Sequence, residues 1–307
     1  MTQALPAEAV YLPFEPPPFR MAMGLVARDP AEMIELDDLY PAELDLRRQL
    51  LTERHAEVYA AEPGTEAARA EVLFRLAELL PARFPDCFAR TNGVLHNRLT
   101  GEHWNLENPG RDPLEAAALL VQEDLCLLRP TPDGPVLTAA VVCFPSRWLL
   151  QEKIGHPLAT VHTRVPFYAE RLARPVDRLM TQLKAGRLVE RLNWSLNDDD
   201  ALFQRSGKWR RAVNPDITEA NAGETLVLRV ERQTLSQLPA SGTVLFTIRV
   251  HVYPIARIVT QPEIAARLAE AVRALPEEMQ HYKSLGRFRE ALLGYLDRRA
   301  APDGKQP

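Results

Sequence analysis

Several signatures of common enzyme classes are absent from this 307-residue chain. It has no G-x-G-x-x-G or G-x-x-x-x-G-K-[ST] loop, no G-x-S-x-G nucleophile motif and no H-E-x-x-H zinc motif. These absences remove the usual support for a dinucleotide-binding enzyme, a P-loop NTPase, an α/β-hydrolase or a zinc protease.

Cysteine is also scarce. The chain has three cysteines, Cys87, Cys126 and Cys143, which lie far apart and form no C-x-x-C pair. We therefore expect neither a cysteine-ligated zinc site nor an iron–sulfur cluster within this chain. Reduced thiols of this kind are typical of a cytoplasmic protein.

Three further features are missing: a long apolar run, a secretory leader pattern and an excess of basic residues. No stretch of about 18 uncharged apolar residues occurs, so we expect no transmembrane helix. The first residues lack a basic segment followed by an apolar one, so we expect no secretory signal. With a net charge of -4 and a pI near 6.0, bulk nucleic-acid binding is not expected.

The residues that are present indicate a folded α+β protein. The composition is 46% hydrophobic and 25% charged, which is ordinary for a globular chain. Two apolar runs around a Pro-Asp-Gly turn predict a β-hairpin over 125–145, and alternating patterns predict strands over 226–235 and 244–253. Helical periodicity occupies 40–60, 64–85, 111–125, 261–275 and 277–300, with Asp112 and Thr65 as expected caps.

This order divides the chain into three parts, which we expect to form one integrated domain. Residues 1–120 would be an extended segment and helices that pack on the core, 121–260 the core itself, and 261–307 closing helices.

The two alternating strands carry polar side chains at regular positions. One face of the first strand presents Arg229, Glu231 and Gln233, and one face of the second is apolar throughout. Two interpretations remain open. The polar face is solvent-exposed with cross-strand ion pairs, or it is the polar floor of a pocket.

Three consecutive aspartates, Asp198 to Asp200, follow Trp194. A calcium loop requires acidic residues at alternate positions and a glycine, which this stretch lacks. We interpret it as a helix cap or a solvated turn.

The stretch KIGHPLATVHTRVPFY holds two histidines, His156 and His162. Each has an ordinary structural explanation. A zinc site would need further ligands at sensible spacing, and none is adjacent. A haem site needs one neutral imidazole, apolar walls and basic groups for the propionates, which Lys153, Arg164 and the nearby Arg147 would supply.

Four blocks together resemble the haem-dependent oxidative N-demethylase family. They are WLLQEKIGHPLATVHTRVPFY, PVDRLMTQLKAGRLVERLNWSL, LRVERQTLSQLP and GTVLFTIRVHVYPI, of which VHTRVP and RVERQTL are the most specific. The resemblance covers about residues 12–260. It implies a PAS-like antiparallel sheet that forms a haem pocket, with N-terminal and C-terminal helices packed around it.

The resemblance also implies a haem-dependent monooxygenase subunit that uses haem b and dioxygen to demethylate a small secondary amine such as dimethylamine. Electrons would come from NADPH through FMN and iron–sulfur centres on separate reductase or ferredoxin-type subunits. Since this chain lacks motifs for those centres, it would be the terminal oxygenase subunit only.

Site residues carry over from the family blocks as follows. His162 in VHTRVP matches the family's iron-ligating histidine, with His156 in reserve. Glu231 and Arg229 in RVERQ would lie on the distal side, where Glu231 would hold the amine or relay protons to bound oxygen. A buried carboxylate would pair with a cationic amine. Tyr168, on the catalytic side, and Trp194, on the cofactor side, would provide apolar or cation–π walls.

A second function remains open. PAS-like pockets also sense gases or redox state, so the chain would then be a haem sensor or carrier without turnover. The sequence carries no fused signalling or DNA-binding module that would favour this reading.

Overall fold

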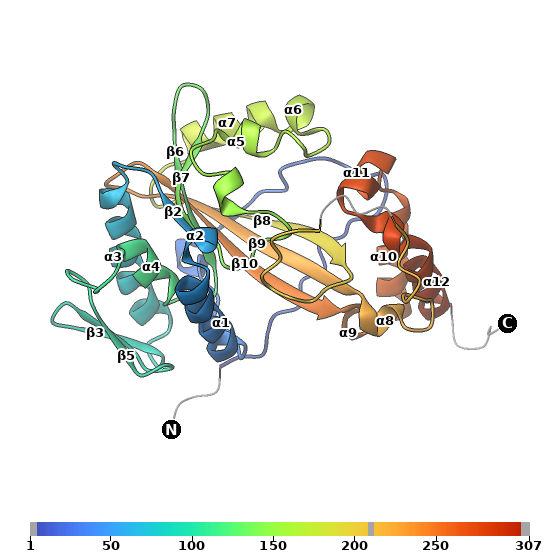
Figure 1. Ribbon diagram of the computed structural model, residues 1–307, viewed down its shortest axis with the longest axis horizontal. Coiled ribbons are helices and arrows are strands. Elements are labelled where there is room, and N and C mark those ends of the chain that lie inside the picture. The colour runs from blue at the N-terminus through green and yellow to red at the C-terminus, as the bar shows by residue number, and fades with distance from the viewer. Residues whose placement is uncertain (1–4, 208–211, 302–307) are drawn as a thin grey trace.

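A seven-stranded antiparallel sheet forms the centre of the computed structural model, which describes residues 5–207 and 212–301 (Figure 1). Its order is β1-β8-β9-β10-β6-β7-β2, and every neighbouring pair is antiparallel. The combination of this sheet with segregated helices confirms the predicted α+β class. The strands are β1 Val26–Arg28, β2 Tyr59–Ala61, β6 Asp124–Arg129, β7 Val136–Val141, β8 Leu188–Asn197, β9 Val227–Gln237 and β10 Val244–Pro254.

The predicted hairpin is confirmed as β6–β7. Its Pro-Asp-Gly turn places Gly134 at a φ of 102°, a backbone conformation that a residue with a side chain adopts only at a cost. A Cβ at this position would also lie 3.2 Å from Oδ1 of Asp177 in α7 (Ala173–Gln182). Glycine is therefore required both by the turn and by the approach of the helix.

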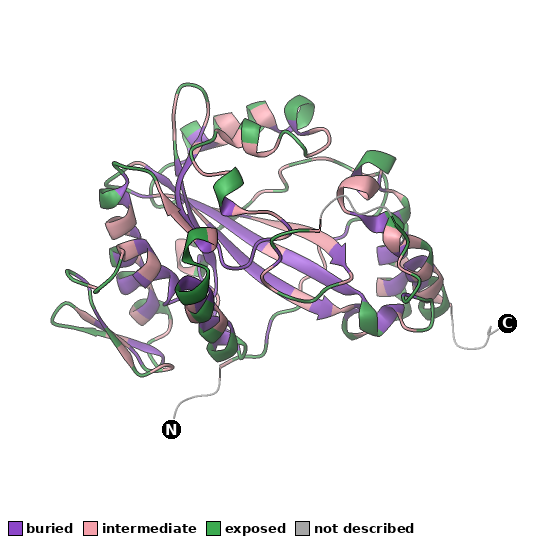
Figure 2. Cartoon of the chain, in the orientation of Figure 1, coloured by how far each residue is buried: buried purple, intermediate pink, exposed green. Residues whose placement is uncertain are grey.

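The two long strands β9 and β10 also match the prediction to within two residues at each end. Glu231 lies opposite Val250 in the ladder, and Arg229 lies opposite Val252. Both faces are covered, because Arg229 is 1% exposed while His251, on the opposite face, is also 1% exposed (Figure 2). The interpretation of a solvent-exposed polar face is therefore wrong, and the polar face points inward.

The N-terminal helices pack against one end of the sheet, beside a small second sheet. Leu125 and Leu127 of β6 join one apolar core with α1, α3 and α4. The predicted helix over 40–60 ends at Glu53, and its last residues form a short helix and an edge strand instead. These elements are η1 Pro30–Glu32, α1 Tyr40–Glu53, α2 His55–Val58, α3 Glu66–Arg83, α4 Pro113–Ala118, and the strands β3 Phe88–Thr91, β4 Val94–Asn97 and β5 Glu102–Asn105.

The two expected helix caps differ in outcome. Asp112 caps α4, since its carboxylate accepts a hydrogen bond from the Leu114 amide at 2.9 Å. Thr65 occupies the cap position of α3, but its hydroxyl donates to the Glu62 carbonyl instead of accepting from the helix. The position of the second cap was predicted correctly and its hydrogen bond was not.

The C-terminal helices pack near the other end of the sheet, against Leu228 and Val230 of β9 and Tyr253 of β10. The helical pattern over 277–300 is interrupted at Ser284, whose φ is 57°, so it forms two helices joined by a 3₁₀ turn. None of the described helices is long and apolar enough to cross a membrane. The elements are α8 Ala222–Thr225, α9 Ile255–Ile258, α10 Pro262–Arg273, α11 Glu277–Tyr282, η3 Leu285–Arg287 and α12 Arg289–Ala300.

At the β6–β7 end, one face of the sheet packs on α1, α3 and α4. The other face is covered by the segment that contains the two histidines. Leu150 and Met180 pack there on Cys126 and Leu128 of β6. This cover comprises η2 Leu150–Glu152, α5 Leu158–Val161, α6 Tyr168–Arg171 and α7. In Figure 1 these helices lie together above the sheet, away from α1 and α3.

The first residues of the described chain are bound to strand β10. Glu8 is 7% exposed and accepts from His251 at 3.2 Å, while its other oxygen accepts from Arg257 at 2.7 Å. Glu35 contacts the second nitrogen of His251 at 3.3 Å. The extended segment at the start of the described chain is therefore anchored to the sheet.

This anchor predicts a pH dependence of stability. Burial alone would lower the pKa of His251, but its hydrogen bonds to Glu35 and Glu8 outweigh burial and raise the pKa. A raised pKa stabilises the fold fully below the unfolded value, about 6.5, and this stability is lost as pH rises through the folded value. We expect the free energy of unfolding of the wild type to fall as pH rises from the unfolded pKa of His251 through its folded pKa. The fall should be smaller in His251→Gln.

Urea unfolding at a series of pH values from 6 to 9 measures the effect. Glu123, whose pKa burial raises to about 7, adds a similar slope to both proteins, so the difference between them isolates His251. His156→Gln, at an exposed position, is the matched control and should keep the wild-type slope. Equal slopes in all three proteins would contradict the assignment.

Candidate functional site

Glu231 lies on β9 with its carboxylate held by two amides. One oxygen, Oε2, accepts from Asn193 of β8 at 3.2 Å and from Gln233 of β9 at 2.8 Å. These three residues share one face because Asn193 is opposite Glu231 in the ladder and Gln233 is two positions further along β9. The half-buried carboxylate is therefore oriented by neutral donors and has no ion pair within the described residues.

Arg191 of β8 lies on the same face, beside this carboxylate. Burial lowers its pKa, and the charges of Glu231 and Tyr168 act in the opposite direction. Its Nε is buried without a hydrogen-bond partner among the residues that the structure describes. Sequence reasoning missed this residue, although the alternation in LVERLNWSLN places it on the face of Asn193.

His162 follows helix α5 and is half-buried. Its Nδ1 donates to the Leu158 carbonyl at 2.8 Å. A carbonyl only accepts, so this bond selects the tautomer in which Nδ1 carries the proton and Nε2 carries the lone pair. That is the form in which an imidazole binds a metal through Nε2.

Tyr168 is a buried neighbour of His162. Its ring stacks on His162 with 4.6 Å between centroids and an angle of 12°. Burial, followed by the charge of Asp177, raises the pKa of Tyr168 to about 12, and Arg191 acts against this rise. The preceding residue, Phe167, has a φ of 65°, a strained conformation for a bulky side chain. Such local strain is frequent where a chain must hold a functional side chain in place.

The three basic residues expected to pair with propionates are placed differently. Arg147 pairs with Asp198 at 2.7 Å, and both side chains are nearly buried. Lys153 donates to the Val161 carbonyl at 3.3 Å and lies over the Trp148 ring. Arg164 is exposed.

We had interpreted Asp198 as part of a helix cap or a solvated turn, and for this residue the interpretation is wrong. Its second oxygen pairs with Arg287 at 2.9 Å, so the side chain joins the 147 region to the C-terminal helices. The next residue, Asp199, does make a local turn, because it accepts from the Ala201 amide at 3.0 Å. The run of three consecutive aspartates gave no sign that Asp198 pairs with the distant Arg147 and Arg287.

Arg229 and Trp194 make no hydrogen bond or ion pair with the Glu231 carboxylate within the described residues, although Arg229 lies two positions away on the same face of β9. Both terminal nitrogens of Arg229 donate to backbone carbonyls, including Phe144 at 2.7 Å, so this residue braces two loops. Trp194 alternates with Asn193 and points to the opposite face, where it contacts Phe14 and Lys283. His156 is exposed. The structure thus brings together His162, Tyr168, Arg191 and Glu231.

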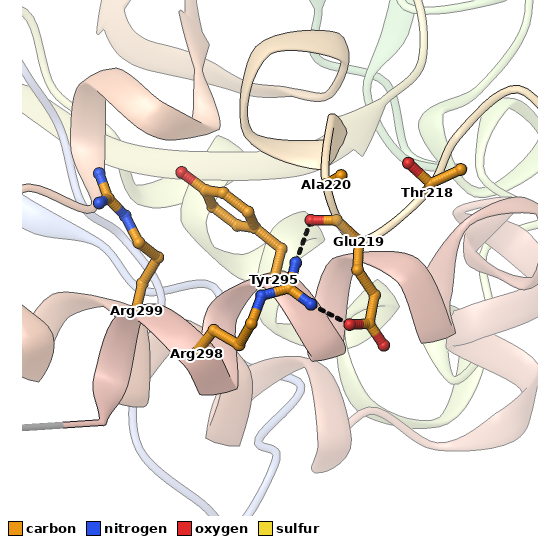
Figure 3. A pocket seen from close by; sticks show the side chains of 6 residues that line it. All are labelled: Thr218, Glu219, Ala220, Tyr295, Arg298 and Arg299. Carbon is orange, nitrogen blue, oxygen red and sulfur yellow. Dashed lines mark hydrogen bonds and ion pairs between the residues drawn. The ribbon is translucent and has the colours of Figure 1, made fainter. Parts of the chain in front are cut away.

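Two surface hollows lie away from this group. One, of about 630 Å³, is bounded by Tyr295, Arg298 and the Glu219 region, where Arg298 donates to Glu219 (Figure 3). The other, of about 350 Å³, is lined by Asp198 to Asp200 and the ends of β9 and β10. Neither contains His162, Tyr168, Arg191 or Glu231.

Comparison with known families gives one match, which spans most of the chain. The family described as haem-dependent oxidative N-demethylase, alpha subunit-like, matches residues 24–293. The chain belongs to this family. The family description indicates dependence on haem and an oxidative demethylase type of activity, and its alpha-subunit designation indicates assembly with other subunits.

The residues of this N-demethylase-like chain fit a haem in their chemistry. A haem requires a neutral imidazole for its iron and cations for its propionates. His162 is held in the tautomer in which Nε2 carries the lone pair, the form that binds a metal, and the Nε of Arg191 is a buried donor without a partner in the described chain. His162 stacks on Tyr168, whose charge in turn acts on the pKa of Arg191.

Proposed function

We propose that this chain is the haem-binding subunit of an enzyme that oxidatively demethylates a small secondary amine such as dimethylamine. The observation that carries the proposal is the family match over residues 24–293. The cluster of His162, Tyr168, Arg191 and Glu231 supports it, because it supplies a metal-binding imidazole and an oriented carboxylate on neighbouring elements.

In this proposal His162 holds the iron of haem b through Nε2, and the Leu158 carbonyl fixes the ring. When bound, haem supplies the activation of dioxygen and the oxidation of the N-methyl carbon. The reaction consumes dioxygen, two electrons and two protons, and yields formaldehyde, the smaller amine and water. The electrons would come from NADPH through flavin and iron–sulfur centres on partner subunits.

Glu231 holds the substrate in this proposal. A secondary amine is protonated at neutral pH, so its N–H would donate to the carboxylate that Asn193 and Gln233 orient. The same carboxylate would accept the ammonium proton when the nitrogen needs its lone pair. Glu231 would therefore position the methyl group and manage one proton.

The absorption spectrum of the protein reconstituted with haem tests the proposal. We expect a Soret band in the wild type, a shifted or missing band in His162→Ala, and an unchanged band in His156→Ala. The two histidines lie in one segment, but His162 is half-buried and His156 is exposed, which makes the second variant a matched control.

Two outcomes would contradict the proposal. A wild type without a Soret band would remove haem binding, and an unchanged spectrum in His162→Ala would remove the ligand assignment. A protein that binds haem and consumes no oxygen with amine and a reductase would be a carrier or sensor, not an enzyme.

A further inference from the structure

Three buried arginines in this protein have anionic partners, whereas a fourth, Arg229, donates to backbone carbonyls instead. Arg47 pairs with Asp124 at 3.0 Å, Arg249 with Asp37 at 2.6 Å, and Arg232 with Glu190 at 2.7 Å. These pairs satisfy the general requirement that a buried charge be compensated, because an isolated one is costly. Arg232 and Arg249 lie opposite each other in the β9–β10 ladder, on the face opposite to Glu231.

Arg191 departs from that pattern. Its Nε is buried without a hydrogen-bond partner, as is the Nε of Arg47, Arg229, Arg232 and Arg249. Unlike those arginines, Arg191 makes no hydrogen bond or ion pair through its terminal nitrogens with any residue of 5–207 or 212–301. The nearest carboxylate, Glu231, is already engaged by Asn193 and Gln233. The described chain therefore leaves a half-buried cation, of which the Nε is fully enclosed, without a direct partner.

The surroundings of Arg191 show where a partner would enter. Strand β1 pairs with β8 only through Leu188 to Glu190, so Arg191 is the first β8 residue beyond that pairing. Tyr168 stacks on His162, and its charge affects the pKa of Arg191. In the ladder Arg191 lies opposite Gln233 and Asn193 lies opposite Glu231, so an anion at Arg191 would lie on the same face of the sheet as the Glu231 carboxylate.

We propose that Arg191 is the anchor for a carboxylate of a molecule bound at the Glu231–His162 cluster. This inference rests on the proposed function, in which the carboxylate is a haem propionate. A carboxylate on the amine substrate is the other source of the same chemistry. A guanidinium binds a carboxylate with two parallel hydrogen bonds, which gives both affinity and orientation.

The propionate source is tested by comparing haem with haem dimethyl ester, in which both carboxylates are blocked. We measure the rate at which each porphyrin leaves the reconstituted protein for an excess of a haem-scavenging globin. Arg191→Met is expected to release haem about tenfold faster than the wild type or more, which is the usual strength of a charge-assisted pair. The release of the dimethyl ester should be unchanged by this substitution.

The substrate source is tested by calorimetric binding of N-methylglycine and dimethylamine. If the carboxylate belongs to the substrate, the wild type will prefer N-methylglycine, Arg191→Met will lose that preference, and haem release will not depend on Arg191. Arg187→Met, at an exposed position four residues earlier, is the matched control and should behave as the wild type in both measurements.

The two proposals fail in distinguishable ways. If the wild type binds neither porphyrin, the proposed function is overturned, and so is the assignment of a haem propionate to Arg191. The amine-binding measurement then decides whether Arg191 binds a substrate carboxylate. If neither measurement depends on Arg191, the anchor is overturned, whether or not haem binds. The haem-free variant should unfold at the same urea concentration as the wild type or a higher one, because it loses a half-buried charge that has no partner in the described chain. A marked loss of stability would reveal a structural partner and overturn the inference.

Discussion

Glu231→Gln is expected to bind haem as the wild type does and to lose amine turnover by about 10²–10⁴-fold, the usual contribution of a positioned acid or base. The substitution keeps the shape of the side chain. Its remaining carbonyl oxygen can still accept from Asn193 and Gln233, which now share Oε2 of the carboxylate. Only the negative charge and the capacity to take a proton disappear.

The measurement is formaldehyde release at several amine concentrations, with the Soret band recorded on the same sample. A fall in kcat with haem retained assigns Glu231 to the chemistry, whereas a rise in KM alone assigns it to amine binding. Glu170→Gln, at an exposed position of helix α6, removes an equal charge near Tyr168 and should leave turnover intact. Wild-type turnover in Glu231→Gln would remove this residue from the mechanism.

The largest effect on stability is expected from Arg47→Met. Both side chains of the Arg47–Asp124 pair are almost wholly buried, and Asp124 also accepts from the amides of Cys143 and Phe144 at 2.8 and 3.0 Å. Burial raises the pKa of Asp124 in spite of these contacts. Removing the arginine leaves the carboxylate without its counter-charge, at a cost of about 3–5 kcal/mol in the free energy of unfolding.

Urea unfolding of three variants tests this expectation. Arg48→Met changes the adjacent residue, whose pairs with Glu102 and Asp45 are more exposed, and should cost about 1 kcal/mol or less. The double variant Arg47→Met, Asp124→Asn should recover part of the loss, because no charge remains buried. Equal losses in Arg47→Met and Arg48→Met would show that the buried pair contributes no more than a surface one.

Local patterns in the sequence predicted those features whose causes are local. The alternation over 226–235 and 244–253 was sufficient to predict β9 and β10, since one face of each strand repeats every second residue. The pair Asp112 and Pro113 was sufficient to predict the start of α4. The edge strands β1 and β2 were missed because three-residue strands depend on the neighbours with which they pair.

The candidate site was predicted only in part, for a similar reason. The inward direction of Glu231 follows from alternation, but the partner of Arg147 is 51 positions away in the chain. Arg191 could have been found by applying the same alternation to LVERLNWSLN, which had not been treated as a strand. Its lack of a partner is a property of the folded structure alone, because any distant acidic residue could have compensated it.

The strand order has a consequence for how this protein is made. Strand β10 ends at Pro254, yet it lies in the middle of the sheet between β9 and β6. During synthesis, the edge of β6 that pairs with β10 therefore stays unpaired until more than 100 residues after the β6–β7 hairpin have emerged from the ribosome. Sheets closed by such distant pairings fold slowly and expose edges that aggregate. We expect slow translation of the β10 region to favour aggregates over folded protein, and chaperones that shield strand edges to improve its yield.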